Sequence, residues 1–196
     1  MRPFRVGVLL CVCSTAMFAQ DFPKAEIFGG YSYANMPVLS GRANANGWNA
    51  SATVNLFKWF GLTSDFNGLY GLKGSETIPL GTGTVTEQIS ENFHSFMFGP
   101  QISYRKGRLV PFAHLLVGES RVAEKLVVSS SSIGGFTLGG PIAHRATTTG
   151  TAAMGLGVDY SISQNLAWRV QADSLLTAGS ASNARISTGI VLRIGK

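Results

Sequence analysis

The chain has 196 residues, of which 45% are hydrophobic and only 13% are charged, and its formal net charge is +6. Charged residues usually make up about 25% of a soluble protein, so this composition excludes a disordered, highly charged chain. No run of about 18 apolar residues follows the N-terminus, which excludes a helical membrane protein. Glycine is frequent, at 24 residues. An apolar, glycine-rich chain without a spanning helix indicates β-structure with one apolar face.

The first element is a secretory signal peptide, predicted over residues 1–19. It has a basic start, an apolar run and small residues up to Ala19. We expect cleavage after Ala19. Because Met17 occupies a position where a small residue is preferred, cleavage after Ala16 is the alternative. The mature chain, 20–196, is predicted to form one domain.

Removal of the leader changes the charge and the cysteine content. Without Arg2 and Arg5, 14 basic residues face 10 acidic ones, a net charge of +4. No basic cluster with interleaved aromatic residues follows, so we expect no nucleic-acid partner. Cys11 and Cys13 both lie in the leader. The mature chain therefore enters an oxidising compartment without a disulfide, and its stability must come from a large core or from a membrane.

Eight segments of the mature chain alternate apolar and polar residues with a period of two, which is typical of strands with one apolar face. Strands of about ten residues have the length that a tilted strand needs to cross a bilayer. In the middle of one of them, 109–122, both the odd-numbered and the even-numbered positions (the two parities of a strand) are apolar. Which of its side chains share the apolar face therefore stays open. In chain order the predicted strands are 26–33, 47–56, 60–70, 93–104, 109–122, 151–160, 166–175 and 185–194.

The predicted connections between these strands alternate in length. Short ones fall near 57–59, 105–108 and 161–165, and longer ones at 34–46, 71–91, 123–149 and 177–183. Short turns on one side and long loops on the other are the layout of a transmembrane barrel. We therefore interpret 34–46, 71–91 and 123–149 as extracellular loops.

Charged side chains indicate which face of the strands is polar. A soluble barrel fills its interior with apolar side chains, whereas a membrane barrel turns its apolar face to lipid. A Lys or Arg at the bilayer midplane on the lipid face would cost about 2–4 kcal/mol. We assign the charged residues to the polar parity and predict a polar network in the lumen. Its predicted members are Glu26, Asp65, Gln101, Glu119, Arg121, Asp159, Arg169, Gln171, Asp173, Arg185 and Arg193.

Aromatic residues on the apolar parity fall near the strand ends, as in the interfacial belts of membrane proteins. A soluble sheet would also alternate but would rarely grade its aromatic residues in this way. Phe60, Tyr104, Tyr160 and Trp168 are predicted to form the belt near the short turns. Tyr31, Tyr33, Trp48 and Tyr70 are predicted to form the opposite belt.

Several short segments carry a resemblance to a known family. They are EIFGGYSY (26–33), FGPQISYR (98–105), PFAH (111–114), GLGVDY (155–160), RVQAD (169–173) and STGIVLR (187–193). Together they resemble strands of small bacterial outer-membrane barrels, which include the transmembrane domain of outer membrane protein A and the opacity-type porin family.

The resemblance covers about 24–196 and implies an all-β, eight-stranded, antiparallel up-and-down transmembrane barrel in the outer membrane of a Gram-negative-type bacterium. Two departures stand out. Such barrels usually end in an aromatic residue, whereas Ile194, Gly195 and Lys196 stand here. No peptidoglycan-binding domain is expected after the eighth strand.

Three histidines are the candidate catalytic or metal-binding groups. His94 is followed by Ser95, but neighbours in a strand point to opposite faces. His114 has no serine two residues away, and His144 falls in a predicted loop. We predict a belt histidine, a core or lumen histidine and a loop histidine respectively, with no enzyme activity, no cofactor and no metal site.

The sequence thus predicts a monomeric outer-membrane barrel with a structural or surface-interaction role. Its predicted partners are outer-membrane lipid and an unidentified extracellular ligand at the three long loops. A narrow passive pore is the alternative function, and a lipid-modifying enzyme is a third. The basic residues of the short turns are predicted to anchor the protein at the membrane interface, with contact to anionic headgroups of the inner leaflet as the more specific alternative. These residues are Lys58, Arg105, Lys106 and Arg108.

Overall fold

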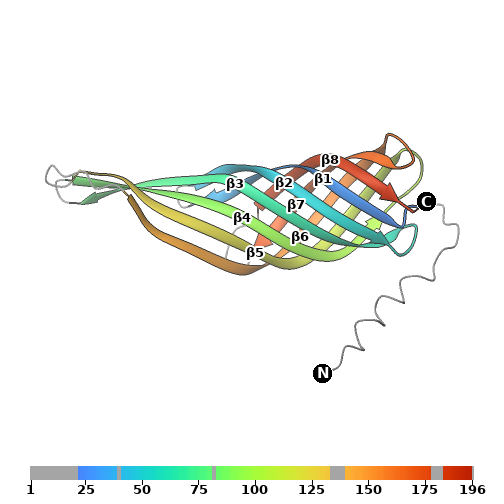
Figure 1. The fold of residues 1–196 in the computed structure, drawn as a ribbon, viewed down its shortest axis with the longest axis horizontal. Coiled ribbons are helices and arrows are strands. Elements are labelled where there is room, and N and C mark those ends of the chain that lie inside the picture. The colour runs from blue at the N-terminus through green and yellow to red at the C-terminus, as the bar shows by residue number, and fades with distance from the viewer. Residues whose placement is uncertain (1–21, 39–40, 81–82, 133–139, 178–182, 196) are drawn as a thin grey trace, which may run out of the picture.

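A computed structural model shows eight strands closed into one barrel (Figure 1). It describes residues 22–38, 41–80, 83–132, 140–177 and 183–195. The predicted signal peptide, 1–19, lies outside the described residues. The strands are β1 (Ala25–Val38), β2 (Gly41–Asn55), β3 (Phe60–Leu80), β4 (Gly83–Ser103), β5 (Leu109–Ser132), β6 (Gly140–Ser161), β7 (Leu166–Thr177) and β8 (Asn183–Ile194).

Each strand pairs antiparallel with its neighbours in the chain, and β1 closes the barrel against β8. When the pairing is followed once around from Ala25, it returns to β1 at Asn35, ten residues further along. This stagger goes with strands tilted by about 35–45° from the barrel axis. The predicted fold class is confirmed. An eight-stranded barrel is only wide enough for its own side chains to fill.

Side chains alternate between the lumen and the outer wall along every strand. The outward positions are apolar and exposed, for example Leu62 in β3, Leu115 in β5 and Leu156 in β6. Polar and charged side chains that point inward are buried, such as Asp65 and Arg169. This inversion of a soluble core is the pattern of a barrel that faces lipid. Within the described residues, no helix is long and apolar enough to cross a membrane.

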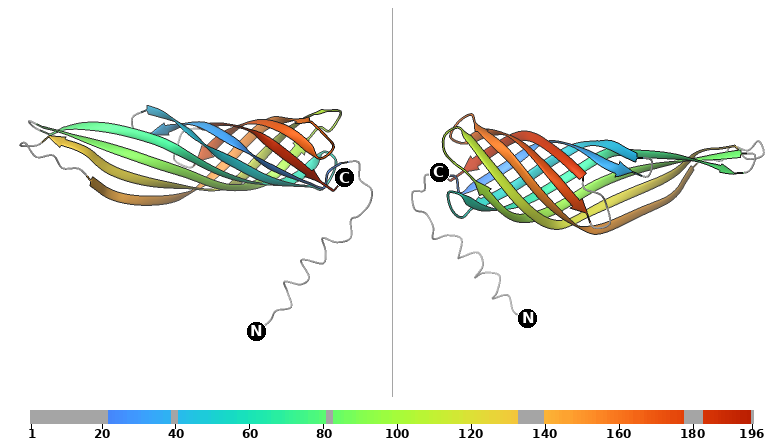
Figure 2. Two further views of the ribbon diagram at one scale, coloured as in Figure 1. Left: turned by 45° about the horizontal axis from the view of Figure 1, so that its top comes forward. Right: turned by 180° about the vertical axis from the view of Figure 1, so that it is seen from behind.

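The barrel is longer on one side. β3, β4, β5 and β6 have 21, 21, 24 and 22 residues, whereas β1, β2, β7 and β8 have 14, 15, 12 and 12. The long strands continue past the others as an open four-stranded sheet, which tapers away from the barrel in all three views (Figures 1 and 2). We call the part of β3–β6 beyond Tyr70, His94, Glu119 and Gly150 the extension.

The extension corrects the prediction of long loops. The described parts of 34–46, 71–91 and 123–149 are strand, and only the tips around 39–40, 81–82 and 133–139 lie outside the described residues. The short connections are confirmed at 56–59, 104–108 and 162–165. Strict alternation fades in the extension because both of its faces meet water. Each of these strands gains its backbone hydrogen bonds from the neighbour that runs beside it.

Candidate functional site

Near the short turns, the lumen holds a cluster of charged side chains from β1, β6, β7 and β8. Arg169 donates two hydrogen bonds to Asp159, at 2.7 Å from Nε and 2.9 Å from Nη2. Arg193 lies 3.4 Å from the same carboxylate and 3.4 Å from Glu26. The Arg169 guanidinium also stacks between two rings, 4.3 Å from the centroid of Phe112 and 5.4 Å from that of Phe28. This first cluster therefore fills the lumen with paired charges and aromatic rings.

A second cluster lies further from the short turns and centres on Arg185. Its guanidinium donates to Asp65 Oδ1 at 2.9 Å and to Asp173 Oδ2 at 2.8 Å. The other oxygen of Asp173 lies 2.8 Å from His114 Nε2. All four side chains are buried. The cluster joins β3, β5, β7 and β8 across the lumen.

Side-chain amides complete the second cluster. Asn49 donates to Asp65 Oδ2 at 2.7 Å, and Gln171 donates to Asn49 Oδ1 at 3.2 Å. Gln101 is also buried, but it accepts a hydrogen bond from Thr63 at 3.1 Å and lies apart from the arginines. The network thus includes Asn49, which the sequence prediction left out, and His114, which was predicted as a core or lumen histidine but not as a member of this network.

Two members of the predicted lumen set are corrected. Glu119 and Arg121 are exposed on the outer wall, because the even residues of β5, such as His114 and Leu116, point into the lumen. The prediction failed where the middle of this strand is apolar on both parities. The remaining predicted members are buried in the lumen: Glu26, Asp65, Gln101, Asp159, Arg169, Gln171, Asp173, Arg185 and Arg193.

The height of Glu119 explains why the outward position is tolerated. It lies ten residues along β5 from Leu109, where the strand begins. A tilted strand rises about 2.5 Å per residue, so Glu119 stands about 25 Å above the short turns. The apolar band of such barrels is also about 25 Å tall. The carboxylate therefore lies at the upper edge of the band, where the extension begins.

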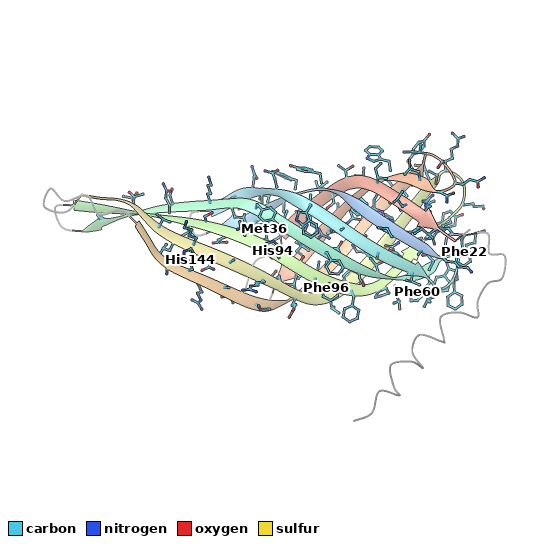
Figure 3. The ribbon with its side chains drawn as sticks, in the orientation of Figure 1. Phe22, Met36, Phe60, His94, Phe96 and His144 are labelled. Atoms are coloured by element: carbon cyan, nitrogen blue, oxygen red, sulfur yellow. The ribbon has the colours of Figure 1, made fainter. Side chains whose placement is uncertain are left out.

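An apolar layer lies in the lumen toward the extension, with buried polar residues such as Asn67 and Ser95 between its members, and the prediction of a polar lumen did not include it. Its members follow the second cluster along each strand: Leu69 comes after Asp65, and Leu175 after Asp173. Met36, labelled in Figure 3, belongs to the same layer. The layer contains Ala34, Met36, Ala45, Leu69, Leu72, Phe93, Met97, Leu116, Ala153 and Leu175.

The aromatic residues predicted for the belts lie on the outer wall. Near the short turns, Trp168 donates to Thr188 at 2.9 Å, and Phe60 is the least exposed of its group. Near the extension, the Trp48 indole donates to the Tyr70 hydroxyl at 3.3 Å. The exposed residues are Tyr31, Tyr33, Trp48, Tyr70, Tyr104, Tyr160 and Trp168. Trp59, in the turn after β2, is also exposed and was not among the predicted belt residues.

The three histidines lie far apart. His94 stands on the outer wall with Nε2 3.0 Å from the Tyr70 hydroxyl, whereas His114 is buried beside Asp173. His144 is exposed on β6 in the extension rather than in a loop (Figure 3). Among the described residues, no group of three His, Cys, Asp or Glu side chains is placed to hold a metal ion.

The closed barrel, its apolar outer band and its filled lumen define the fold as that of a small outer-membrane β-barrel. Comparison with solved structures agrees. Ail, the attachment invasion locus protein of Yersinia pestis, is 12% identical with a TM-score of 0.59, covering 88% of this chain and 99% of Ail. A structure of Ail with the heparin analogue sucrose octasulfate is 14% identical, with a TM-score of 0.56 over 87% of this chain and 97% of that one.

Neisserial surface protein A is similar as well, at 10% identity and a TM-score of 0.53, with 89% of this chain and 100% of that protein covered. At these identities the likeness shows the fold alone. No family model and no curated protein sequence matches the chain.

Proposed function

We propose that this protein stands in the bacterial outer membrane as a closed barrel and acts at the cell surface through its extension. The observation that carries the proposal is the extension itself. β5 continues for thirteen residues beyond Glu119, which is about 40 Å of strand. Four paired strands hold this surface in one shape, so it can present side chains with less ordering cost than separate loops.

The charges of the extension favour a polyanionic partner. On its outer face, Lys73 lies beside Ser90, and Ser90 beside Lys125, with both lysines exposed. Arg121 stands lower on the same face of β5. Among the described side chains of this face, Glu119 at its lower edge is the single carboxylate. We propose sulfated or phosphorylated glycans as the class of partner, since these match an array of cations.

The filled lumen supports a surface role over the alternative of a narrow pore. Arg169 between two rings, the Arg185 cluster and the apolar layer follow one another along the barrel. An ion would have to displace paired buried charges and then cross apolar side chains, and both steps are costly.

The surface role can be tested on intact cells that produce the protein, because only the extension side is then accessible. Retention of these cells on immobilised heparin should exceed retention on neutral dextran and should fall with added salt. The variant K73Q/R121Q/K125Q should lower retention at least severalfold. The matched control K58Q/K106Q/R108Q removes the same charge from the opposite end and should retain normally. Equal retention of all three strains would contradict the proposal.

A further inference from the structure

The outer wall carries an apolar groove of about 500 Å³ at the short-turn end. It lies between the turn that precedes β3 and the turn that joins β4 to β5. Its lining includes one polar residue, Ser103, and otherwise comes from Trp59, Ile102, Tyr104, Pro111, Phe112 and Ala113. The groove therefore faces the hydrocarbon of the leaflet next to the short turns, which is the periplasmic leaflet in barrels of this layout.

Hydrogen bonds hold the two turns beside the groove together. Arg105 donates to the carbonyl oxygen of Lys58 at 2.7 Å and to Asn55 Oδ1 at 2.9 Å. The same guanidinium lies 3.2 Å from the buried Glu26. The backbone N–H of Ser103 donates to the Trp59 carbonyl at 2.8 Å. The groove and the turns above it thus form one preorganised unit, anchored to the first cluster in the lumen.

Three cations stand in these turns without a partner among the described residues. Lys58, Lys106 and Arg108 are exposed, and none of their side chains has a hydrogen bond or ion pair in the described part of the chain, although the main-chain carbonyls of Lys58 and Arg108 accept hydrogen bonds. The positive φ of Gly107, 91°, lets the chain turn tightly between two of them. Within the described residues, no side-chain carboxylate is exposed at this end, since Glu26 and Asp159 are buried and paired.

We infer that this unit binds an anionic phospholipid of the periplasmic leaflet. An acyl chain would lie in the groove, and the headgroup phosphate would be held by Lys58, Lys106 and Arg108. The geometry differs from general interfacial anchoring because an apolar groove and three uncompensated cations are fixed side by side. Arg105 is the positioning residue, since its guanidinium faces the lumen and joins the turns.

The test is lipid retention by the folded protein. Protein is released by native mass spectrometry from micelles that contain equal amounts of phosphatidylglycerol and phosphatidylcholine with the same acyl chains. The wild type should retain phosphatidylglycerol preferentially. K58Q/K106Q/R108Q should lower that preference by about tenfold, because each basic residue near an anionic headgroup adds to the attraction. K73Q/R121Q/K125Q is the control, as it removes three charges from the opposite end.

A second variant tests the groove without a change in charge. Ala113→Phe places a ring in the groove and should lower retention of both lipids, and Ala113→Leu serves the same purpose if the larger residue prevents folding. Folding is checked by the heat-dependent shift in gel migration. Equal losses in the two triple variants, or full retention after the groove is filled, would overturn the inference. Retention on heparin by intact cells is independent of either result, so the two proposals fail separately.

Discussion

Among single residues, Arg185 is one of the fully buried charges of the lumen. It bridges Asp65 and Asp173, which come from opposite sides of the lumen. Replacing one partner of a buried ion pair leaves the other charge uncompensated, which costs about 3–5 kcal/mol. Arg185→Met keeps a similar length but removes the charge, and we expect a loss of about that size in the free energy of unfolding, measured by urea titration in lipid vesicles.

The matched control for this substitution is Arg121→Met. Arg121 is exposed on the outer wall and has no ion pair among the described residues, so its replacement should change stability by less than about 0.5 kcal/mol. Similar losses for the two variants would show that the Arg185 bridges contribute nothing specific.

A glycine makes room for the His114–Asp173 pair. A Cβ at Gly155 would stand 1.9 Å from Asp173 Oδ1 and 2.3 Å from His114 Nε2. Gly155→Ala should therefore force the pair apart and destabilise the barrel by about 1–3 kcal/mol. Gly150→Ala, in the same strand, meets nothing within 4 Å and is the control. The two urea midpoints should differ clearly, and coincident midpoints would contradict the steric explanation.

Sequence alternation was sufficient to place residues such as Asp65 and Arg169 in the lumen. With a strict period of two, either the odd or the even residues of a strand face the lumen, and the positions of the charged residues decide which. It failed at Glu119 and Arg121, where both parities of β5 are apolar. It could not identify partners, because the residues that meet across the lumen are far apart in sequence. His114 and Asp173 are separated by 59 positions, and Asp65 and Arg185 by 120.

Among the elements, the four long strands are the part that the sequence did not reveal. Their outer ends mix Ser, Thr, Gly and charged residues, a composition that is common in loops and also compatible with strands exposed to water. What makes them strands is pairing with a neighbour of matching length. The predicted aromatic belt at Trp48 and Tyr70 lies at the level where the extension begins, but it did not indicate what lies beyond.

The inner face of the extension carries a pair of like charges that should make it sensitive to pH. Glu91 in β4 lies directly opposite Glu124 in β5. Partial burial, followed by repulsion from Glu124, raises the pKa of Glu91 above its usual value. Because the folded-state pKa is the higher one, the contribution of this group to stability is full below the unfolded pKa and is lost as pH rises through the raised pKa.

Glu91→Gln should therefore stabilise the extension at neutral pH by a few tenths of a kcal/mol and flatten its pH dependence. The measurement is hydrogen-exchange protection of β4 amides between pH 4 and 8, corrected for intrinsic exchange rates. Glu119→Gln is the control, since Phe96 and Gly150 rather than a carboxylate lie opposite Glu119. Protection in the Glu91 variant that still decreases with pH as in the wild type would contradict this assignment.

At the scale of the whole molecule, the interior changes character along the barrel axis. The first cluster sits near the short turns, the Arg185 cluster follows, and the apolar layer lies toward the extension. The outer wall changes in the opposite sense, from apolar in the band to basic and polar on the extension. The part within the apolar band therefore has its apolar side chains on the outside, like a membrane barrel. The extension presents polar side chains on its outer face, more like a soluble sheet.

This arrangement predicts that the barrel does not conduct ions. Leu69, Phe93 and Met97 belong to the apolar layer, with Asn67 and Ser95 buried among them, and Arg169 fills the lumen nearer the short turns through its contacts with two rings. Purified protein in planar bilayers should show no reproducible single-channel steps. F93A/M97A should lower stability by several kcal/mol through the cavity it creates, yet stay silent because the Arg169 block remains. Regular conductance steps in the wild type would contradict this prediction and support the narrow pore. Ions would then have passed both the Arg169 contacts and the apolar layer.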